Sequence, residues 1–431
     1  MPVRLDRSSA DFDERFATFL AAKREVSADV ERATRAIVDD VAARGDAALL
    51  EATKKFDRLD IDASGLRVTA AEIDAAVGAC DTATLDALKF ARDRIEAFHR
   101  RQLPKDERFT DALGVELGWR WSAVDAVGLY VPGGTAAYPS SVLMNAVPAR
   151  VAGVPRVVMV VPSPDGKLNP LVLAAAQLGG VSEIYRVGGA QAVAALAYGT
   201  ATIAPVAKIV GPGNAYVAAA KRQVFGKVGI DMIAGPSEVL VIADDTGNAG
   251  WIAADLLAQA EHDASAQSIL ITDSARLAAE VESAVESQLK TLPRADIARA
   301  SWNDFGAIIM VRQLDEAVEL ANAIAAEHLE IMTADVEGLS AKVRNAGAIF
   351  LGSHTPEAIG DYVGGSNHVL PTARSARFSS GLGVLDFMKR TSILKCGPDQ
   401  LRALGPAAMT LGKAEGLDAH SRSVGLRLNL P

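Results

Sequence analysis

The sequence is poor in cysteine, histidine and aromatic residues. Its 431 residues include two cysteines, Cys80 and Cys396, and six histidines, and only 5% are aromatic. Two cysteines so far apart exclude a disulfide framework and a CxxC zinc site, and they indicate a reducing compartment. With so few aromatic residues, alanine and the aliphatic residues must fill the core. This composition favours a helix-rich α/β protein over a β-sandwich.

Excess positive charge and long apolar runs are also lacking. Lys and Arg number 44 against 53 Asp and Glu, a net charge of −9, which weighs against a nucleic-acid-binding protein because such proteins usually carry a basic face. The apolar stretch over residues 141–161 is interrupted by prolines, glycine and arginines, so it cannot span a bilayer. The N-terminal residues lack the apolar segment of a secretory signal. We therefore expect a cytoplasmic protein with no nucleic-acid or membrane partner.

The spacing of apolar residues predicts helices first and alternating strands and helices afterwards. Helices are expected over residues 11–20, 28–56 with a break near Gly45, and 82–101, and strands over residues 114–131. Strand–helix alternation then runs over residues 157–225 and again over residues 238–351. Buried strands joined by helices form parallel sheets, so two α/β modules in tandem are expected. Residues 398–415 are predicted to be helical and are followed by an arm that ends at Pro431.

Glycine-rich turns follow several of the expected strands. They include Gly133-Gly134, Gly188-Gly189, Gly211-Pro212-Gly213-Asn214 and Gly235-Pro236. Glycine lets the backbone approach a ligand closely, and a helix that starts after such a turn offers free N–H groups to an anion. None of these turns matches GxGxxG or GxxxxGK[ST], so a standard nucleotide fingerprint is absent. Tight structural turns and ligand loops both remain open.

A metal site is one hypothesis for the scarce histidines. Gln259 and His262 are three residues apart on an expected helix, so both side chains project from one face. Together with Asp361 and His420 they would form a nitrogen and oxygen ligand set that suits Zn²⁺ or another first-row ion. Sequence spacing cannot show that these positions converge, and an ordinary polar pair at a helix end stays open.

An acid/base pair is the second hypothesis. Glu327 and His328 stand at an expected helix-to-strand junction and are both able to move protons, although a plain polar connection fits as well. His99, on a charged helix, and His354, in a turn, are expected to be surface and loop residues. At this point the residues indicate an α/β enzyme, with metal dependence as one option.

Several unusual sequence motifs occur along the chain: GLYVPGG at 128–134, GGAQA at 188–192, GPGN at 211–214, DMIAGPSEVL at 231–240, QAEH at 259–262, AEHLE at 326–330, GDY at 360–362, NHVLPT at 367–372 and EGLDAH at 415–420. Together these motifs resemble those of the histidinol dehydrogenases, and they occur in the family's order over almost the whole chain after residue 120. So many unusual strings in one order are far more specific than any single one.

The resemblance implies a fold of two incomplete Rossmann-like modules, related to the aldehyde dehydrogenase-like group, with a helical N-terminal segment and a C-terminal dimerisation arm. The expected division is an N-terminal helical segment (1–25), a zinc and substrate module (26–129 plus 237–381), an NAD-binding module (130–236) and a helical arm that contributes to the partner's active site (382–431).

The resemblance also implies an activity. The enzyme would be a homodimer of histidine biosynthesis that oxidises L-histidinol to L-histidine through L-histidinaldehyde, a four-electron reaction that uses Zn²⁺ and two NAD⁺. Glu327 and His328 match the family's acid/base pair. The other family positions are zinc ligands (Gln259, His262, Asp361 and, from the partner subunit, His420), NAD⁺ contacts (Tyr130, Gln191, Asn214) and substrate contacts (Ser237, Gln259, His262, His328, Asp361, Glu415, His420). His368 lies in a family motif and is expected to make a backbone or supporting contact rather than to bind the metal.

Three alternatives remain at the level of sequence. A paralogue could use the same zinc and bases on another small alcohol, a metallohydrolase could use Glu327 with zinc-bound water, and a silent homologue could have lost activity. The complete set of ligands and bases makes the last the least favoured. Neither cysteine matches a catalytic position, which disfavours a thiohemiacetal route.

Overall fold

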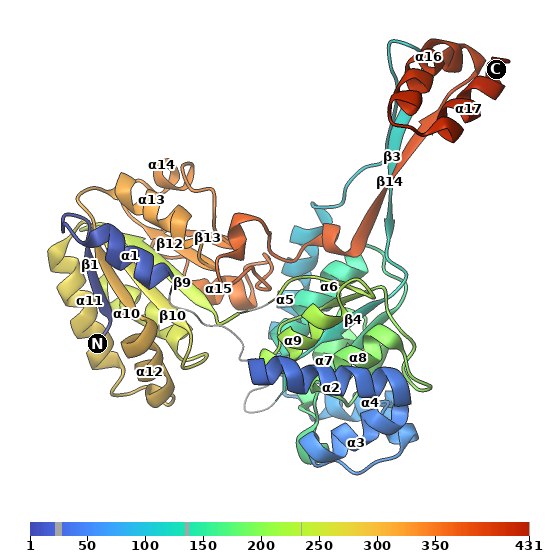
Figure 1. Cartoon of the computed structure of the whole chain (residues 1–431). Coiled ribbons are helices and arrows are strands. Elements are labelled where there is room, and N and C mark those ends of the chain that lie inside the picture. Colours follow the sequence, from blue (N-terminus) through green and yellow to red (C-terminus); the bar gives the residue numbers. More distant parts are fainter. Residues whose placement is uncertain (22–27, 134–137, 234, 431) are drawn as a thin grey trace.

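The computed structural model describes residues 1–21, 28–133, 138–233 and 235–430. Figure 1 shows two α/β modules side by side and an arm that projects from one of them. Each module is built on a parallel sheet whose central strands are short, mostly apolar runs buried on both faces, as in Val157–Val160. Strands of this kind need helices on both sides, which is why they form parallel rather than half-exposed sheets.

The five-stranded module contains one of the two parallel sheets. Its strand order is β6 (Glu183–Tyr185), β5 (Val157–Val160), β4 (Val127–Tyr130), β7 (Lys208–Val210) and β8 (Gly229–Ile230). Numbered within the module, this is the order 3-2-1-4-5, a Rossmann sheet without its sixth strand. Its connecting helices are α6 (Pro139–Val151), α7 (Pro170–Gly179), α8 (Gly189–Tyr198) and α9 (Ala215–Val224). Alanine fills much of this core, since residues 190–197 of α8 are all buried.

The six-stranded module repeats the same order and adds one strand. The sheet runs β1 (Val3–Asp6), β11 (Ala307–Met310), β10 (Gln267–Thr272), β9 (Glu238–Ala243), β12 (His328–Met332) and β13 (Ala348–Leu351). Its helices are α1 (Phe12–Ala21), α10 (Ala249–Ala260), α11 (Ala275–Gln288), α12 (Ala295–Phe305), α13 (Leu314–Ile324), α14 (Val336–Ser340) and α15 (Glu357–Tyr362). The predicted pair of incomplete Rossmann-like modules is therefore confirmed.

The predicted assignment of the N-terminal residues to modules needs correction. Helices α2 (Ala28–Arg44), α3 (Asp46–Asp57), α4 (Ala70–Ala79) and α5 (Thr82–Arg100) pack on α6, α7, α8 and α9, so they belong to the five-stranded module and not with residues 237–381. The first residues are no separate segment either, because β1 pairs with β11. The predicted boundary at 25/26 lies outside the described residues. The predicted break near Gly45 is confirmed: Gly45 has φ 57° and separates α2 from α3.

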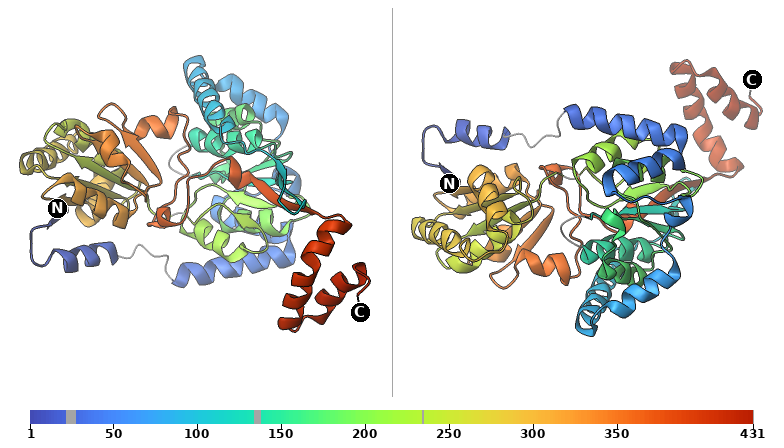
Figure 2. Two further views of the ribbon diagram at one scale, coloured as in Figure 1. Left: turned by 90° about the horizontal axis from the view of Figure 1, so that it is seen from above. Right: turned by 90° about the horizontal axis from the view of Figure 1, so that it is seen from below.

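The arm is a β-ribbon that carries two helices. Strands β2 (Glu107–Thr110), β3 (Glu116–Ala123) and β14 (Met388–Lys395) form an antiparallel sheet, and α16 (Pro398–Ala414) and α17 (Asp418–Arg427) pack on each other at its tip. Figures 1 and 2 show these helices extending away from both modules. The arm thus includes residues from two distant parts of the chain. Four short 3₁₀ turns complete the described elements: η1 (Ala63–Gly65), η2 (Pro164–Gly166), η3 (Ser375–Arg377) and η4 (Val384–Phe387).

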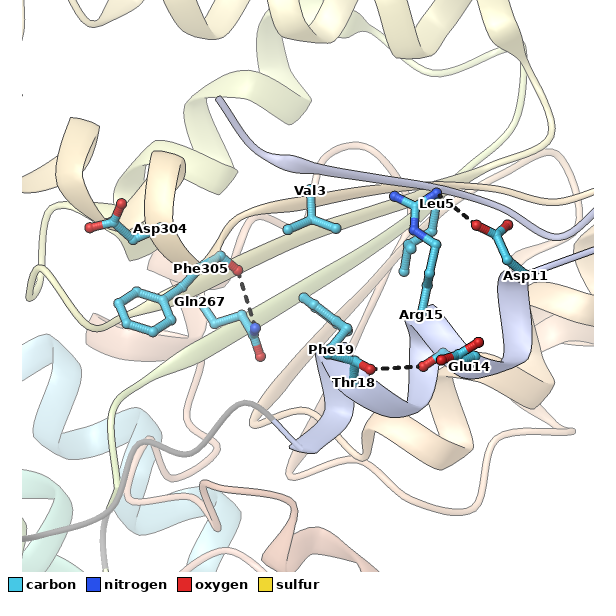
Figure 3. A pocket seen from close by; sticks show the side chains of 10 residues that line it. All are labelled: Val3, Leu5, Asp11, Glu14, Arg15, Thr18, Phe19, Gln267, Asp304 and Phe305. Carbon is cyan, nitrogen blue, oxygen red and sulfur yellow. Dashed lines mark hydrogen bonds and ion pairs between the residues drawn. The ribbon is translucent and has the colours of Figure 1, made fainter. Parts of the chain in front are cut away.

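One pocket lies at the edge of the six-stranded sheet. It has a volume of about 550 Å³ and lies between α1, β1 and the residues before β11, with Phe19, Gln267 and Phe305 on its walls (Figure 3). None of the site residues predicted from the sequence lines it. Among the described helices, none has an apolar stretch long enough to cross a membrane.

Candidate active site

His328 is the first residue of β12 and lies beside the start of the neighbouring strand β9. Its Nδ1 is 3.1 Å from the carbonyl oxygen of Glu238. A carbonyl oxygen only accepts hydrogen bonds, so Nδ1 carries the proton and Nε2 keeps its lone pair. Nε2 is buried, has no hydrogen-bond partner among the described residues and lies 3.9 Å from Oδ1 of Asp361. The strand pairing therefore sets the tautomer and aims the basic nitrogen at Asp361.

The surroundings of His328 keep its imidazole neutral. Burial lowers the pKa of His328 to about 4, the nearby Asp361 carboxyl raises it in part, and His262 and His368 lower it further. The side chain is 3% exposed and packs near the ring of Phe350. A neutral imidazole with a free lone pair is able to accept a proton at pH 7.

Glu327 precedes His328 and is held by backbone contacts. Its Oε2 accepts a hydrogen bond of 3.0 Å from the amide of Glu238, and its carbonyl accepts one of 2.9 Å from the amide of Ala348. A Cβ on Gly347 would lie 2.5 Å from that carbonyl oxygen, so only glycine fits here without moving Glu327. Burial, followed by the carboxyls of Glu238 and Asp361, raises the pKa of Glu327 well above its ordinary value.

This pair does not lie at the edge where open α/β sheets usually bind ligands. Both side chains stand at the amino ends of β9 and β12 rather than at the carboxyl ends. In Figure 1 this edge of the six-stranded sheet faces the five-stranded module. Glu327 and His328 therefore lie where the six-stranded module faces the five-stranded module.

Asp361 is placed by α15 and by His368. The carbonyl oxygen of Asp361 accepts a 2.9 Å hydrogen bond from Nδ1 of His368. Nε2 of His368 is 3.3 Å from Oγ of Ser141, which lies on α6 of the other module. His368 therefore makes the expected backbone contact and also links the two modules beside the site.

Gln259 and His262 also lie in this region. Helix α10 packs on α15, His262 is close enough to His328 to lower the pKa of that imidazole, and Nε2 of Gln259 is 3.1 Å from Nδ1 of His262. Oε1 of Gln259 is buried and has no hydrogen-bond partner among the described residues. A buried carbonyl oxygen of this kind normally has a partner, so its position beside His262 fits a cation ligand.

A set of buried carboxyls behind His328 did not stand out in the sequence. Oε1 of Glu357 is 3.6 Å from Nδ1 of His328, and His328, Glu357 and Asp361 have potential ligand atoms within 4.8 Å of one another. Further back, Oε1 of Glu330 accepts a 2.7 Å hydrogen bond from the amide of Glu357. Glu357 is four residues before Asp361 on α15, and this spacing was the one available signal that they share a face. Their burial depends on packing that spans distant segments.

Burial of Glu330 is expected to make stability depend on pH. Desolvation, followed by the nearby Asp255 carboxyl, raises the pKa of Glu330 from 4.5 to about 8. Between these pH values the folded chain holds a proton that the unfolded chain has lost, so this contribution to stability is complete below pH 4.5 and is lost as the pH rises through 8. Glu330→Gln should raise the free energy of unfolding by up to about 5 kcal/mol at pH 9, the equivalent of this pKa shift, and leave it nearly unchanged at pH 4.5.

Urea unfolding of the wild type and the variant at the two pH values measures this difference. Glu337→Gln, at an exposed position of the same module, is the matched control and should change neither value. Equal effects of Glu330→Gln at both pH values would show that the change acts through packing and not through the proton.

The glycine turns of the five-stranded module surround Tyr130. Its hydroxyl oxygen accepts a 3.0 Å hydrogen bond from the amide of Gly189, and burial raises the pKa of Tyr130 to about 12. Gln191 is buried in the first turn of α8, whose N-cap residue Gly188 makes no side-chain cap. Asn214 caps α9 by accepting hydrogen bonds from the amides of Tyr216 and Val217. Of the three residues predicted to bind NAD⁺, Tyr130 is thus the last residue of β4, Gln191 follows β6 and Asn214 follows β7.

A buried ion pair holds the turn after β7. Nζ of Lys221 donates to the carbonyl oxygen of Gly211 at 2.9 Å and to the carboxylate of Asp231, which accepts from the Gly211 amide at 2.8 Å. Gly211 has φ 106°, and a Cβ there would lie 2.2 Å from the carbonyl oxygen of Tyr130. The sequence does not predict this pair, because two residues ten positions apart give no sign that both are buried.

Two predicted site residues lie far from the others within one chain. Glu415 ends α16 and His420 lies on α17, both exposed at the tip of the arm. Figures 1 and 2 show that this tip projects away from α15. The single chain therefore brings together Glu327, His328, Gln259, His262 and Asp361, but not Glu415 or His420. Ser237 immediately precedes β9 and is partly buried.

His99 departs from the sequence prediction. It was expected on the surface but is completely buried, and its Nδ1 is 2.7 Å from the carbonyl oxygen of Ile95. The last turn of α5 lies beneath residues 363–367, to which Arg94 also binds through the carbonyl oxygens of Val363 and Gly364. His354 is exposed, as expected for a loop residue.

Comparisons with known proteins agree over the full length of the chain. The family model described as "Histidinol dehydrogenase" matches residues 20–428. A histidinol dehydrogenase of Bradyrhizobium diazoefficiens is 86% identical over 430 residues, and one of Rhodopseudomonas palustris is 81% identical over 429 residues; each match covers 100% of both chains. The crystal structure of histidinol dehydrogenase from Elizabethkingia anophelis aligns with a TM-score of 0.94 at 35% identity, covering 99% of this chain and 98% of that one.

Proposed function

Since this chain belongs to the histidinol dehydrogenase family, we propose that it oxidises L-histidinol to L-histidine through L-histidinaldehyde, at the end of histidine biosynthesis. The reaction removes four electrons and uses two NAD⁺ and one Zn²⁺ per site. The observation that carries this proposal is the neutral Nε2 of His328, buried and unpartnered among the described residues and directed at Asp361.

The residues around Asp361 fit a zinc ion. Gln259, His262 and Asp361 offer oxygen and nitrogen donors, and the buried Oε1 of Gln259 lacks another partner among the described residues. His420 of a second subunit would complete the set. These residues would hold the ion, which when bound would supply a positive charge that orients the substrate.

The turns of the five-stranded module fit the dinucleotide. Tyr130 ends β4 and Asn214 follows β7, and these two strands flank the point where the strand order reverses, the usual place for a nucleotide. Gln191 lies in the first turn of α8, after the edge strand β6. The first turn of α8 starts at Gly188 without a side-chain cap, which leaves N–H groups for a pyrophosphate. When bound, NAD⁺ accepts the hydride in each of the two oxidations.

In the first oxidation His328 acts as the base. Its Nε2 takes the hydroxyl proton of histidinol as the hydride leaves the adjacent carbon, so the alcohol becomes the aldehyde. The carbonyl of Glu238 stabilises the imidazolium through Nδ1–H. His328 then has to release this proton before it acts again.

In the second half Glu327 and His328 act in turn. Glu327 removes a proton from the water that adds to the aldehyde, and the aldehyde oxygen gains the proton that His328 took in the first oxidation, which gives the gem-diol. His328 takes a hydroxyl proton of the gem-diol as the second hydride leaves, and the product is the carboxylic acid. Burial among carboxyls raises the pKa of Glu327, which makes its ionised form a stronger base than an exposed glutamate.

The arm gives the dimer a role in catalysis. Because Glu415 and His420 lie at the tip of a projecting ribbon, we propose that they enter the site of a second subunit. Glu415 would then contact the substrate, as would Ser237 at the start of β9. The enzyme would work as a homodimer with shared active sites in the cytoplasm.

The stoichiometry of NADH tests the proposal. Zinc-loaded enzyme should form two NADH for each histidinol consumed, with little free aldehyde, as followed by absorbance and by chromatography of the product. One NADH per histidinol would contradict the four-electron scheme. Turnover of another small alcohol but not of histidinol would identify a paralogue, and turnover without NAD⁺ would indicate a hydrolase.

A further inference from the structure

The carboxyl end of β5 is closed by a carboxylate from another part of the chain. Asp57 is the last residue of α3, and its Oδ2 accepts a 3.2 Å hydrogen bond from the amide of Ser163, which follows β5 after Val161 and Pro162. Asp57 is 6% exposed and Ser163 is fully buried. In the strand order 3-2-1-4-5 of the five-stranded module, β5 is the second strand.

Two polar atoms at this point have no partner in the described part of the chain. Oδ1 of Asp57 makes no hydrogen bond there, and Oγ of Ser163 is buried without one. A buried hydroxyl such as that of Ser163 normally finds a partner. A ligand hydroxyl, which both donates and accepts, would satisfy a carboxylate oxygen and a serine hydroxyl together.

The position of Asp57 is built by its neighbours. Arg58 and Asp165 both have φ 55°, a left-handed conformation that side chains rarely adopt. They bind each other through two hydrogen bonds of 2.8 and 2.7 Å, which join the end of α3 to η2 just after β5. This clamp fixes the Asp57 carboxylate against Ser163 and also occupies the guanidinium of Arg58.

Two of the glycine turns proposed to bind the nucleotide pack against Pro162, beside Ser163. A Cβ on Gly133 would lie 2.6 Å from Cγ of Pro162, and one on Gly188 would lie 2.4 Å from Cβ of Pro162. The turns after β4 and β6 therefore both contact the residue before Ser163. Asp57 is also close enough to Tyr130 to contribute to the raised pKa of that phenol.

In Rossmann sheets an acidic residue at the carboxyl end of the second strand binds the 2′-hydroxyl of the adenosine ribose, whereas NADP-binding sites place an arginine there. Here residues 161–163 supply no carboxylate, and α3 brings one to the same place. We propose that Asp57, with Ser163, binds the adenosine 2′-hydroxyl of the dinucleotide and selects NAD⁺ over NADP⁺. This inference rests on the proposed use of NAD⁺ by the five-stranded module.

The charges at this point support the choice of NAD⁺. A 2′-phosphate would place its negative charge beside the Asp57 carboxylate, and like charges at contact repel. The adjacent cation, Arg58, already donates two hydrogen bonds to the carboxylate of Asp165. A hydroxyl gains a charge-assisted hydrogen bond at the same position.

Binding of three dinucleotides to the zinc-loaded dimer tests the proposal. Calorimetry would compare the binding of NAD⁺, of an NAD⁺ analogue that lacks the adenosine 2′-hydroxyl, and of NADP⁺. Each would be measured on the wild type and on Asp57→Asn, an isosteric variant that still accepts a hydrogen bond from the Ser163 amide. In the wild type, removal of the 2′-hydroxyl should weaken binding at least tenfold, and NADP⁺ should bind at least a hundredfold more weakly than NAD⁺. In Asp57→Asn both ratios should shrink at least fivefold.

Glu51→Gln is the matched control, because Glu51 is another α3 carboxylate but pairs with Arg44 and not with Ser163. It should keep both wild-type ratios. Unchanged ratios in Asp57→Asn, with an unaltered thermal midpoint, would overturn the role of Asp57 while NAD⁺-dependent oxidation of histidinol stands. Absence of NAD⁺ binding to the wild type would instead contradict the proposed function itself.

Discussion

Replacement of His328 by asparagine should lower kcat for histidinol oxidation by about 10²- to 10⁴-fold, the usual contribution of a general base. Asparagine retains an N–H group where Nδ1–H of the imidazole stands, so the hydrogen bond to the Glu238 carbonyl is preserved. What the variant loses is Nε2, the nitrogen that faces Asp361 at 3.9 Å. The substitution therefore removes the proton acceptor with little change to the strand that carries it.

The readouts separate a base from a ligand or a structural residue. Metal analysis should find the same zinc content in His328→Asn as in the wild type, and the thermal midpoint should change little. His354→Asn, at an exposed loop histidine, is the control and should keep full activity. Loss of zinc along with activity would reassign His328 as a ligand, whereas near-normal kcat would remove it from the mechanism.

The pH dependence of kcat/KM gives an independent check on His328. Burial lowers the pKa of the free imidazole to about 4, so the base stays unprotonated well below pH 6. The acid limb of the profile should therefore lie below the range of an ordinary histidine near 6.5. In His328→Asn any residual activity should lose this limb. A wild-type acid limb at pH 6.5 would contradict the neutral, buried imidazole.

Much of the fold follows from local sequence patterns. The central strands of both sheets are mostly apolar runs such as residues 157–160 and 239–243, and their burial on both faces makes the parallel arrangement predictable. The order of strands then follows from short right-handed crossovers. In contrast, the helices within residues 28–100 give no sign of the module on which they pack. An amphipathic helix specifies an apolar face and not its partner.

The candidate site was likewise predictable only where its residues are close in the sequence. Glu327 and His328 are adjacent, and Gln259 and His262 share a helix face, so their proximity could be predicted from spacing. Glu357 and Asp57 could not be selected, since a carboxylate in the sequence reads as exposed unless long-range packing buries it. His99 shows the same limit, because neighbouring arginines on α5 suggested a surface position for a side chain that the loop at 363–367 covers.

Mixing two inactive variants should restore activity if the active site is shared between subunits. His262→Asn and His420→Asn each remove one proposed zinc ligand, so each homodimer should be almost inactive. In a mixed dimer the His420→Asn chain supplies an intact His262, and the His262→Asn chain supplies an intact His420 to the same site. One of the two sites is then complete. With random exchange of equal amounts, half the dimers are mixed, and about a quarter of wild-type activity should return.

The structure explains why this effect should be large. His262 lies at the end of α10 beside α15, and His420 lies on α17 at the tip of the projecting arm. The arm keeps His420 away from His262 of the same chain. Its strands β3 and β14 pair along eight residues each and form a continuous hydrogen-bonded ribbon that carries α17. A pair of differently tagged subunits would verify exchange. If verified mixed dimers stayed inactive while wild-type exchange controls kept full activity, His420 would not reach the partner's site, and the function of the arm would be assembly alone.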